Sequence, residues 1–108
     1  MKGLWMLGAG MLLSFQAAAG YVNDAKITKV RVEANGKGTI ALDSNINGSP
    51  ACTGYYSVLS FDAGSAGGKA IMEMAQLAKE HYWSVTVEGS GACSIYPSLE
   101  DVQSLTLE

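Results

Sequence analysis

The sequence predicts one small domain that is mostly antiparallel β-structure with a single α-helix, in the order β-β-β-α-β-β. Five segments alternate apolar and polar residues as half-buried strands do. One further segment repeats apolar residues with the period of a helix. Clusters of Gly, Asn, Ser and Pro separate these segments and predict turns.

Residues 1–19 are predicted to be a secretory signal peptide. The segment begins with its one charge at Lys2, continues as an apolar run over residues 4–13, and ends in three alanines. This pattern is typical of a leader removed on export. The run is about half of the roughly 20 residues needed to cross a membrane. We therefore expect a secreted or periplasmic mature domain of residues 20–108 with no membrane span, cleaved on one side of Gly20 or the other.

Charge and cysteine content limit the classes of partner. Without Lys2 the mature chain has six basic and ten acidic residues, a formal charge of −4. An acidic domain lacks the field that attracts phosphates, so we expect no nucleic-acid partner. Cys52 and Cys93 are the two cysteines and predict one disulfide in an exported domain. The chain has no C-x-x-C spacing and one histidine, so we expect no metal site and no cofactor.

Alternation that begins at Lys26 predicts the first strand, after a polar lead of residues 20–25. In this strand Ile27 is expected to face away from the core. Asn35-Gly36 tolerates positive φ angles and predicts a hairpin turn into an antiparallel second strand over residues 39–42. The residues expected to face the core are Thr28, Val30, Val32 and Ala34 in the first strand and Ile40 and Leu42 in the second.

The middle of the chain predicts a loop, a strand and the helix. Residues 43–54 are rich in Asn, Ser and Gly and form the loop, and residues 55–61 form the third strand. Because strand side chains alternate, only one of Tyr55 and Tyr56 at its start can face the core. Ser65 is the expected cap of a helix over residues 69–81. The expected inward stripe of this helix is Ala70, Ile71, Met74, Leu77, Ala78 and His81.

Two strands complete the chain. Residues 83–88 alternate and predict the fourth strand, with Trp83 packed in the core. A glycine-rich turn and an irregular segment with Pro97 follow, and residues 102–107 form the fifth strand. Glu100-Asp101, just before the last strand, is interpreted as a solvated pair of carboxylates.

The order of these elements is that of the OB-fold, a partly open five-stranded Greek-key barrel whose surface binds oligonucleotides or oligosaccharides. The helix would close one end of the barrel with its apolar stripe. The disulfide would tie the start of the third strand to the segment after the fourth. An α+β sheet with the helix packed on one face is the alternative.

Residues 68–87, GKAIMEMAQLAKEHYWSVTV, run from the predicted helix into an alternating strand. This stretch, the export signal, the element order and the single disulfide together resemble the OB-fold B subunits of AB5 toxins, in particular the subtilase-cytotoxin and pertussis-like group. The resemblance covers about a third of the chain closely and implies glycan binding by a pentamer. It assigns no glycan-contacting residue, and a non-toxin exported relative fits it equally well.

Catalysis is not indicated. His81 ends the helix and is interpreted as a cation near the negative end of the helix dipole or as a partly buried packing residue. No serine lies in a G-x-S-x-G motif that would mark a nucleophile. Gly64, Gly67 and Gly68 precede no Lys-Ser/Thr pair, so they are interpreted as a flexible connector and not as a phosphate loop.

Binding residues are sought in the loops, where aromatic faces and short polar groups lie together. The candidate ligand-binding residues are Asn45, Asn47, Ser49, Tyr55, Tyr56 and Tyr96. We expect a non-catalytic module that binds a protein partner in the envelope or the medium. The alternative is a glycan-binding, B-subunit-like homo-oligomer.

Overall fold

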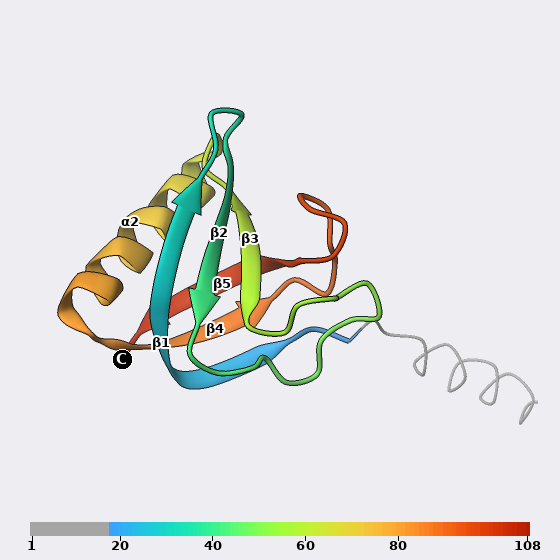
Figure 1. The fold of residues 1–108 in the computed structure, drawn as a ribbon, viewed down its shortest axis with the longest axis horizontal. Helices are drawn as coiled ribbons and strands as arrows, with labels where there is room; N and C mark the ends of the chain where they lie inside the picture. The colour runs from blue at the N-terminus through green and yellow to red at the C-terminus, as the bar shows by residue number, and fades with distance from the viewer. Residues whose placement is uncertain (1–17) are drawn as a thin grey trace, which may run out of the picture.

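The computed structural model describes residues 18–108, shown in Figure 1. The predicted signal peptide lies almost wholly outside these residues and stays a prediction. The order β-β-β-α-β-β and the mostly β character with one helix are confirmed. The elements are β1 (Tyr21–Val32), β2 (Lys37–Leu42), β3 (Val58–Asp62), α2 (Ala66–His81), β4 (Ser84–Gly89) and β5 (Glu100–Leu107).

The five strands form one sheet that closes on itself in the order β1-β2-β3-β5-β4. The first half of β1 pairs with β4 and its second half pairs with β2, both antiparallel. β3 pairs with β5 in parallel, while the β2–β3 and β4–β5 pairs are antiparallel. α2 packs against β1, β3 and β5 and lies along one side of the sheet (Figure 1).

The predicted hairpin joins β1 to β2. Gly36 has a φ of 91°, a conformation that glycine adopts without steric cost. The Asn35 side-chain oxygen accepts a hydrogen bond of 3.0 Å from the Lys37 amide and so holds the turn. The hairpin prediction is therefore confirmed, and Ile40 and Leu42 face the core as expected.

The predicted faces of the first strand are wrong except at Val30, which packs against the core, because Thr28, Val32 and Ala34 are exposed. β1 begins at Tyr21, so the expected polar lead is part of the strand. Ile27 is buried opposite Leu42, whereas Val32 is half exposed at 50%. The cause is a shift of the β1–β2 register between Ile27 and Lys29, because an extra residue there reverses which side chains face inward.

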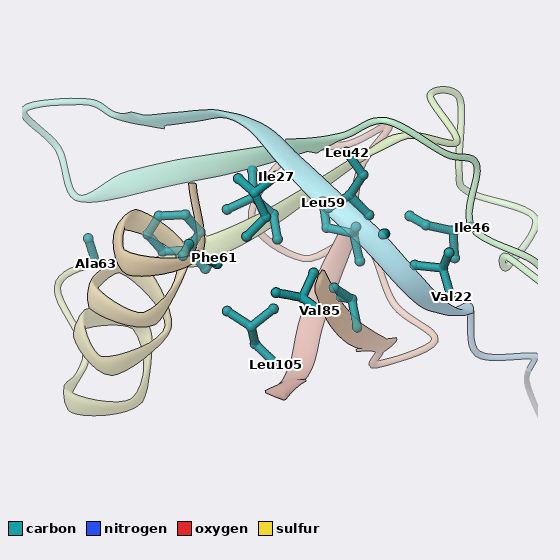
Figure 2. Close-up of a cluster of buried hydrophobic side chains, with 14 residues drawn as sticks. Val22, Ile27, Leu42, Ile46, Leu59, Phe61, Ala63, Val85 and Leu105 are labelled. Atoms are coloured by element: carbon teal, nitrogen blue, oxygen red, sulfur yellow. The ribbon is translucent and has the colours of Figure 1, made fainter. Parts of the chain in front are cut away.

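The core fills the closed sheet from end to end. Figure 2 shows Val22 and Ile46 side by side at one end and Phe61 beside α2 at the other. The Phe61 ring lies on Gly38 of the neighbouring strand, where an added Cβ would come within 2.4 Å of the ring. The buried hydrophobic residues are Val22, Ala25, Ile27, Ile40, Leu42, Ile46, Leu59, Phe61, Ala63, Ala75, Ala78, Val85, Val87 and Leu105.

The helix is confirmed, but it begins three residues earlier than predicted, at Ala66. Ser65 caps it, because its hydroxyl oxygen accepts a hydrogen bond of 2.9 Å from the Gly68 amide. Gly68 packs so closely on the end of β3 that an added Cβ would lie 1.6 Å from the Asp62 carbonyl oxygen. This contact sets the rotation of the helix. The buried residues are consequently Gly68, Ala75 and Ala78, while Ala70, Leu77 and His81 of the predicted stripe are exposed.

Three predicted strand boundaries also shift. β3 begins at Val58, so both preceding tyrosines lie outside it and neither faces the core. Trp83 precedes β4, is 43% exposed and stacks on His81 with 4.5 Å between ring centroids. β5 begins at Glu100, which is fully buried. The solvated-pair interpretation is therefore wrong for Glu100, because backbone amides donate hydrogen bonds to its carboxylate.

The predicted disulfide is confirmed, with 6.2 Å between the Cα atoms of Cys52 and Cys93. It joins the loop that precedes β3 to the loop that follows β4. Within residues 18–108 no helix is long and apolar enough to span a membrane.

Replacing both cysteines by serine should lower the free energy of unfolding by about 4 kcal/mol, since the bridge joins residues that are 41 positions apart in the sequence. Denaturant unfolding of the oxidised protein, the reduced protein and the double variant measures this. The reduced protein should match the variant. Equal midpoints for all three would show that the bridge contributes nothing to stability.

Candidate functional site

A groove of about 360 Å³ lies between the two loops that the disulfide joins. These loops extend on the side of the molecule opposite α2, coloured green and orange-red in Figure 1. The walls are mostly apolar and come from segments that lie far apart in the chain. The lining residues are Tyr55, Val58, Tyr96, Pro97, Ser98 and Leu99.

Short backbone contacts hold the two walls together. The Gly54 amide donates a hydrogen bond of 2.8 Å to the Ser98 carbonyl oxygen. The approach is close, since a Cβ on Gly54 would lie 3.2 Å from the Ser98 Cβ. Tyr96 and Leu99 form a short bridge with Pro97 at the turn between them. The disulfide and these contacts therefore fix the two walls of the groove relative to each other.

The loop that follows β4 is fixed to β5 by the Asp101 carboxylate. Its oxygens accept hydrogen bonds from the Ser60 hydroxyl at 3.1 Å and from the Ser94 amide at 3.1 Å. A further bond of 3.3 Å comes from the Ile95 amide, next to Tyr96. Asp101 therefore acts as a structural acceptor that ties the loop carrying Tyr96 to β5.

The phenol of Tyr96 is tied to the β1–β2 hairpin. Its hydroxyl donates a hydrogen bond of 2.5 Å to Glu33 Oε1, and Lys37 Nζ lies 5.4 Å from its ring centroid. The hydrogen bond from Tyr96, more than the nearby charge of Arg31, holds the pKa of Glu33 below its ordinary value. The same bond raises the pKa of Tyr96 above its ordinary value. The hydrogen bond to Glu33 thus links the Tyr96 side chain, which lines the groove, to the β1–β2 hairpin.

The structure brings two of the six predicted ligand residues together, Tyr55 and Tyr96. Tyr56 is 52% exposed but does not line the groove. Asn45 and Asn47 are exposed on either side of buried Ile46, away from the groove lining. Ser49 is half buried, and its hydroxyl oxygen has no hydrogen-bond partner among residues 18–108.

Four lining residues were missed from the sequence, namely Val58, Pro97, Ser98 and Leu99. The signal available for three of them was the irregular segment around Pro97 directly after Cys93. A disulfide between two loops places the residues that flank each cysteine close together. Val58 gave no such signal, because it looks like an ordinary strand residue.

A second hollow, also of about 360 Å³, lies between the start of α2 and β5. Asp62 and Asp101 are among its lining residues, and both side chains accept hydrogen bonds from neighbouring amides. No group of three residues able to hold a metal ion is found in the described part of the chain. His81 is exposed at the end of α2 and stacks on Trp83.

Comparison of the chain with models of known protein families, with characterised proteins and with solved structures found no match in any of the three. The site is therefore interpreted from its own geometry.

Changing Tyr96 to Phe should raise the pKa of Glu33 toward its ordinary value of 4.5, because the phenol hydrogen bond is the largest cause of its depression. A depressed pKa stabilises the fold above the unfolded pKa, and this stabilisation is lost as the pH falls through the folded pKa. The variant should therefore lose less stability on acidification.

Carboxyl-carbon NMR titration measures this shift directly. Asp43 is the internal control, since its lowered pKa comes first from the hydrogen bond of the Lys26 amide and should not change. An unaltered Glu33 titration in the Phe variant would show that the phenol does not govern this carboxyl.

Proposed function

We propose that the exported domain is a non-catalytic binding module that holds an extended, apolar segment of a protein partner in the Tyr55–Tyr96 groove. The observation that carries this proposal is a preformed apolar groove walled by an exposed aromatic side chain. Tyr55 is 64% exposed although it lies next to a rigid, disulfide-tied turn. An exposed aromatic residue at the rim of an apolar hollow is typical of a protein interface.

The groove chemistry favours a peptide segment with aliphatic or aromatic side chains. Val58, Pro97 and Leu99 offer no charged group, so a charged ligand would lose hydration there without a partner. Tyrosine supplies a large contact area with few rotatable bonds, and it is enriched among residues that dominate binding energy. The groove volume is within the range of pockets that enclose a small ligand or a few side chains.

We propose further that the closed sheet is an OB-fold barrel. Its support is the helix between β3 and β4, the sharing of β1 between two partners and the parallel β3–β5 pair. Loops at the mouth of such barrels bind ligands, and the groove lies on loops of this kind. The disulfide is compatible with an oxidising compartment, the periplasm or the medium.

Glycan binding by a B-subunit-like oligomer is the second candidate, because exposed tyrosine rings also stack on sugars. A sugar site needs amides or carboxylates around the ring to bind hydroxyl groups. Asn45 and Asn47, the side chains suited to that task, do not line the groove. This placement makes an apolar peptide the better ligand for the Tyr55–Tyr96 groove.

Changing Tyr55 to a photoreactive phenylalanine derivative should crosslink a specific protein in the exported fraction, while the same change at position 56 should not. The two positions are adjacent and similarly exposed, but position 56 does not line the groove. Mass spectrometry of the crosslinked peptide identifies the bound segment, which should be apolar and extended.

Tyr55→Ala should then weaken binding of the corresponding synthetic peptide by roughly 30-fold, as expected of an interface hot spot. Calorimetry measures this, and Tyr56→Ala is the matched control, with less than about a threefold effect. Equal losses in both variants would contradict groove binding. A pentamer in light scattering together with retention on a glycan array, and no crosslinked protein, would replace the proposal by the glycan-binding candidate.

A further inference from the structure

A carboxylate is buried where the described chain enters the sheet. Glu100, the first residue of β5, has no solvent-exposed surface. Its Oε2 accepts hydrogen bonds from the Gly20 amide at 2.9 Å and the Gly91 amide at 2.8 Å. Its Oε1 is buried and has no hydrogen-bond partner among residues 18–108. The one ion pair in this range joins Arg31 and Glu33, so no cationic side chain pairs with Glu100.

Glycines form the walls around this carboxylate. A Cβ on Gly20 would lie 2.4 Å from Glu100 Oε1, and one on Gly89 would lie 2.1 Å from Glu100 Oε2. Gly20 itself is buried, and the same added Cβ would come within 2.4 Å of Ile46, which Figure 2 shows beside Val22 at this end of the core. The carboxylate therefore lies directly against Gly20, with no room for a side chain between them.

The neighbouring residues contrast with Gly20. Ala18 and Ala19 are exposed, so the chain becomes buried at Gly20. The Gly20 carbonyl oxygen accepts a hydrogen bond of 2.8 Å from the Gly89 amide, and the strand pairing of β1 begins at the next residue. The predicted leader thus ends at Ala19, and the backbone nitrogen of the next residue, Gly20, is the atom that faces Glu100.

We propose that export cleaves the bond between Ala19 and Gly20, and that the new α-ammonium group of Gly20 becomes the buried counterion of Glu100. Hydrolysis by the protease that removes the leader breaks the C–N bond. The oxygen of water joins the Ala19 carbonyl carbon, which becomes a carboxylate. Both protons of water pass to the Gly20 nitrogen, which becomes an ammonium group with three donors. One donor keeps the bond to Oε2, and Oε1 gains the cationic partner that it lacks.

The alternative cleavage sites do not give this pairing. Cleavage after Gly20 would remove the carbonyl that accepts from Gly89 and would place the ammonium on Tyr21, whose nitrogen faces the Asn47 carbonyl oxygen at 2.8 Å. Cleavage before Ala18 or Ala19 would leave the charge on an exposed residue. The structure thus favours one of the two bonds that the sequence leaves open. This inference does not depend on the groove or its ligand.

The first test expresses the full chain with its leader and measures the mass of the exported protein, which should begin at Gly20. The second test compares four exported proteins: the wild type, two variants with one change each, and the variant with both changes. One change inserts an extra Ala before Gly20, which moves the ammonium outward while Gly20 keeps its amide hydrogen. The other is Glu100→Gln, which removes the charge and preserves the shape. Mass spectrometry of each protein checks its N-terminus.

The insertion should lower the thermal midpoint by roughly 5–10 °C with Glu100 present, as expected for loss of a charge-assisted hydrogen bond in a domain of this size. In the Glu100→Gln background the same insertion should change the midpoint by less than about 2 °C. The α-amine of the folded wild-type protein should also react at least about tenfold more slowly with an amine-selective acylating reagent than that of the insertion variant, because ion pairing and burial lower its reactivity.

A mature N-terminus at any other residue would overturn the proposal. So would an insertion effect of equal size with and without the Glu100 charge. The first test and the amine reactivity need only chains that keep Glu100, so they decide the question even if Glu100→Gln fails to fold. Peptide binding in the groove should be the same in the wild-type and insertion proteins, which separates this inference from the proposed function.

Discussion

The structure depends on one strand that pairs with two others. The first half of β1 pairs with β4 and its second half pairs with β2, and these two pairings close the sheet. A flat strand would not bend enough to reach both. β1 bends through two irregularities, one between Val22 and Ala25, where Asp24 has a φ of 54°, and one between Ile27 and Lys29. Closure leaves every strand with two neighbours and encloses the core.

The candidate site takes its rigidity from this closed sheet and not from the loops alone. The Cys52–Cys93 bridge and the Gly54–Ser98 hydrogen bond join the two loops to each other. Asp101 of β5 then anchors one loop to the sheet, and Glu33, directly after β1, accepts the hydrogen bond of the Tyr96 hydroxyl. The groove is thus supported by polar side chains that do not line it.

Local features were predictable from the sequence, and features that depend on distant contacts were not. The Asn35-Gly36 turn and the Ser65 cap follow from backbone preferences of a few residues, and the disulfide was predicted from two cysteines in a chain with a predicted export signal. Strict alternation predicted that Ile27 faces away from the core. The β-bulge that turns Ile27 inward arises from the pairing of β1 with β2, so the sequence of β1 alone does not reveal it. Trp83 was expected in the core because it is large and apolar. Tyr82 instead adopts the αL conformation at the end of α2, and Trp83 stacks on His81, the last residue of the helix.

The burial of the Glu100 carboxylate also depends on distant contacts and could not be predicted from the sequence. A carboxylate beside an aspartate is usually solvated, and nothing nearby in sequence indicates the amides of Gly20 and Gly91 that bind it. Of the six candidate ligand residues, Tyr55 and Tyr96 meet because the disulfide lies between their loops. The polar residues of the same loop flank buried Ile46, whose inward position the loop composition did not reveal.

The pairing of β1 with β4 and of β3 with β5 has a consequence for the timing of folding. The first strand of the domain needs a partner that follows the helix, and the parallel pair needs the last strand of all. During synthesis from the N-terminus, the β1–β2–β3 meander is made before either partner. The sheet can close only after β5 has been synthesised. Non-local pairings of this kind fold slowly, so the closed sheet and its core form late.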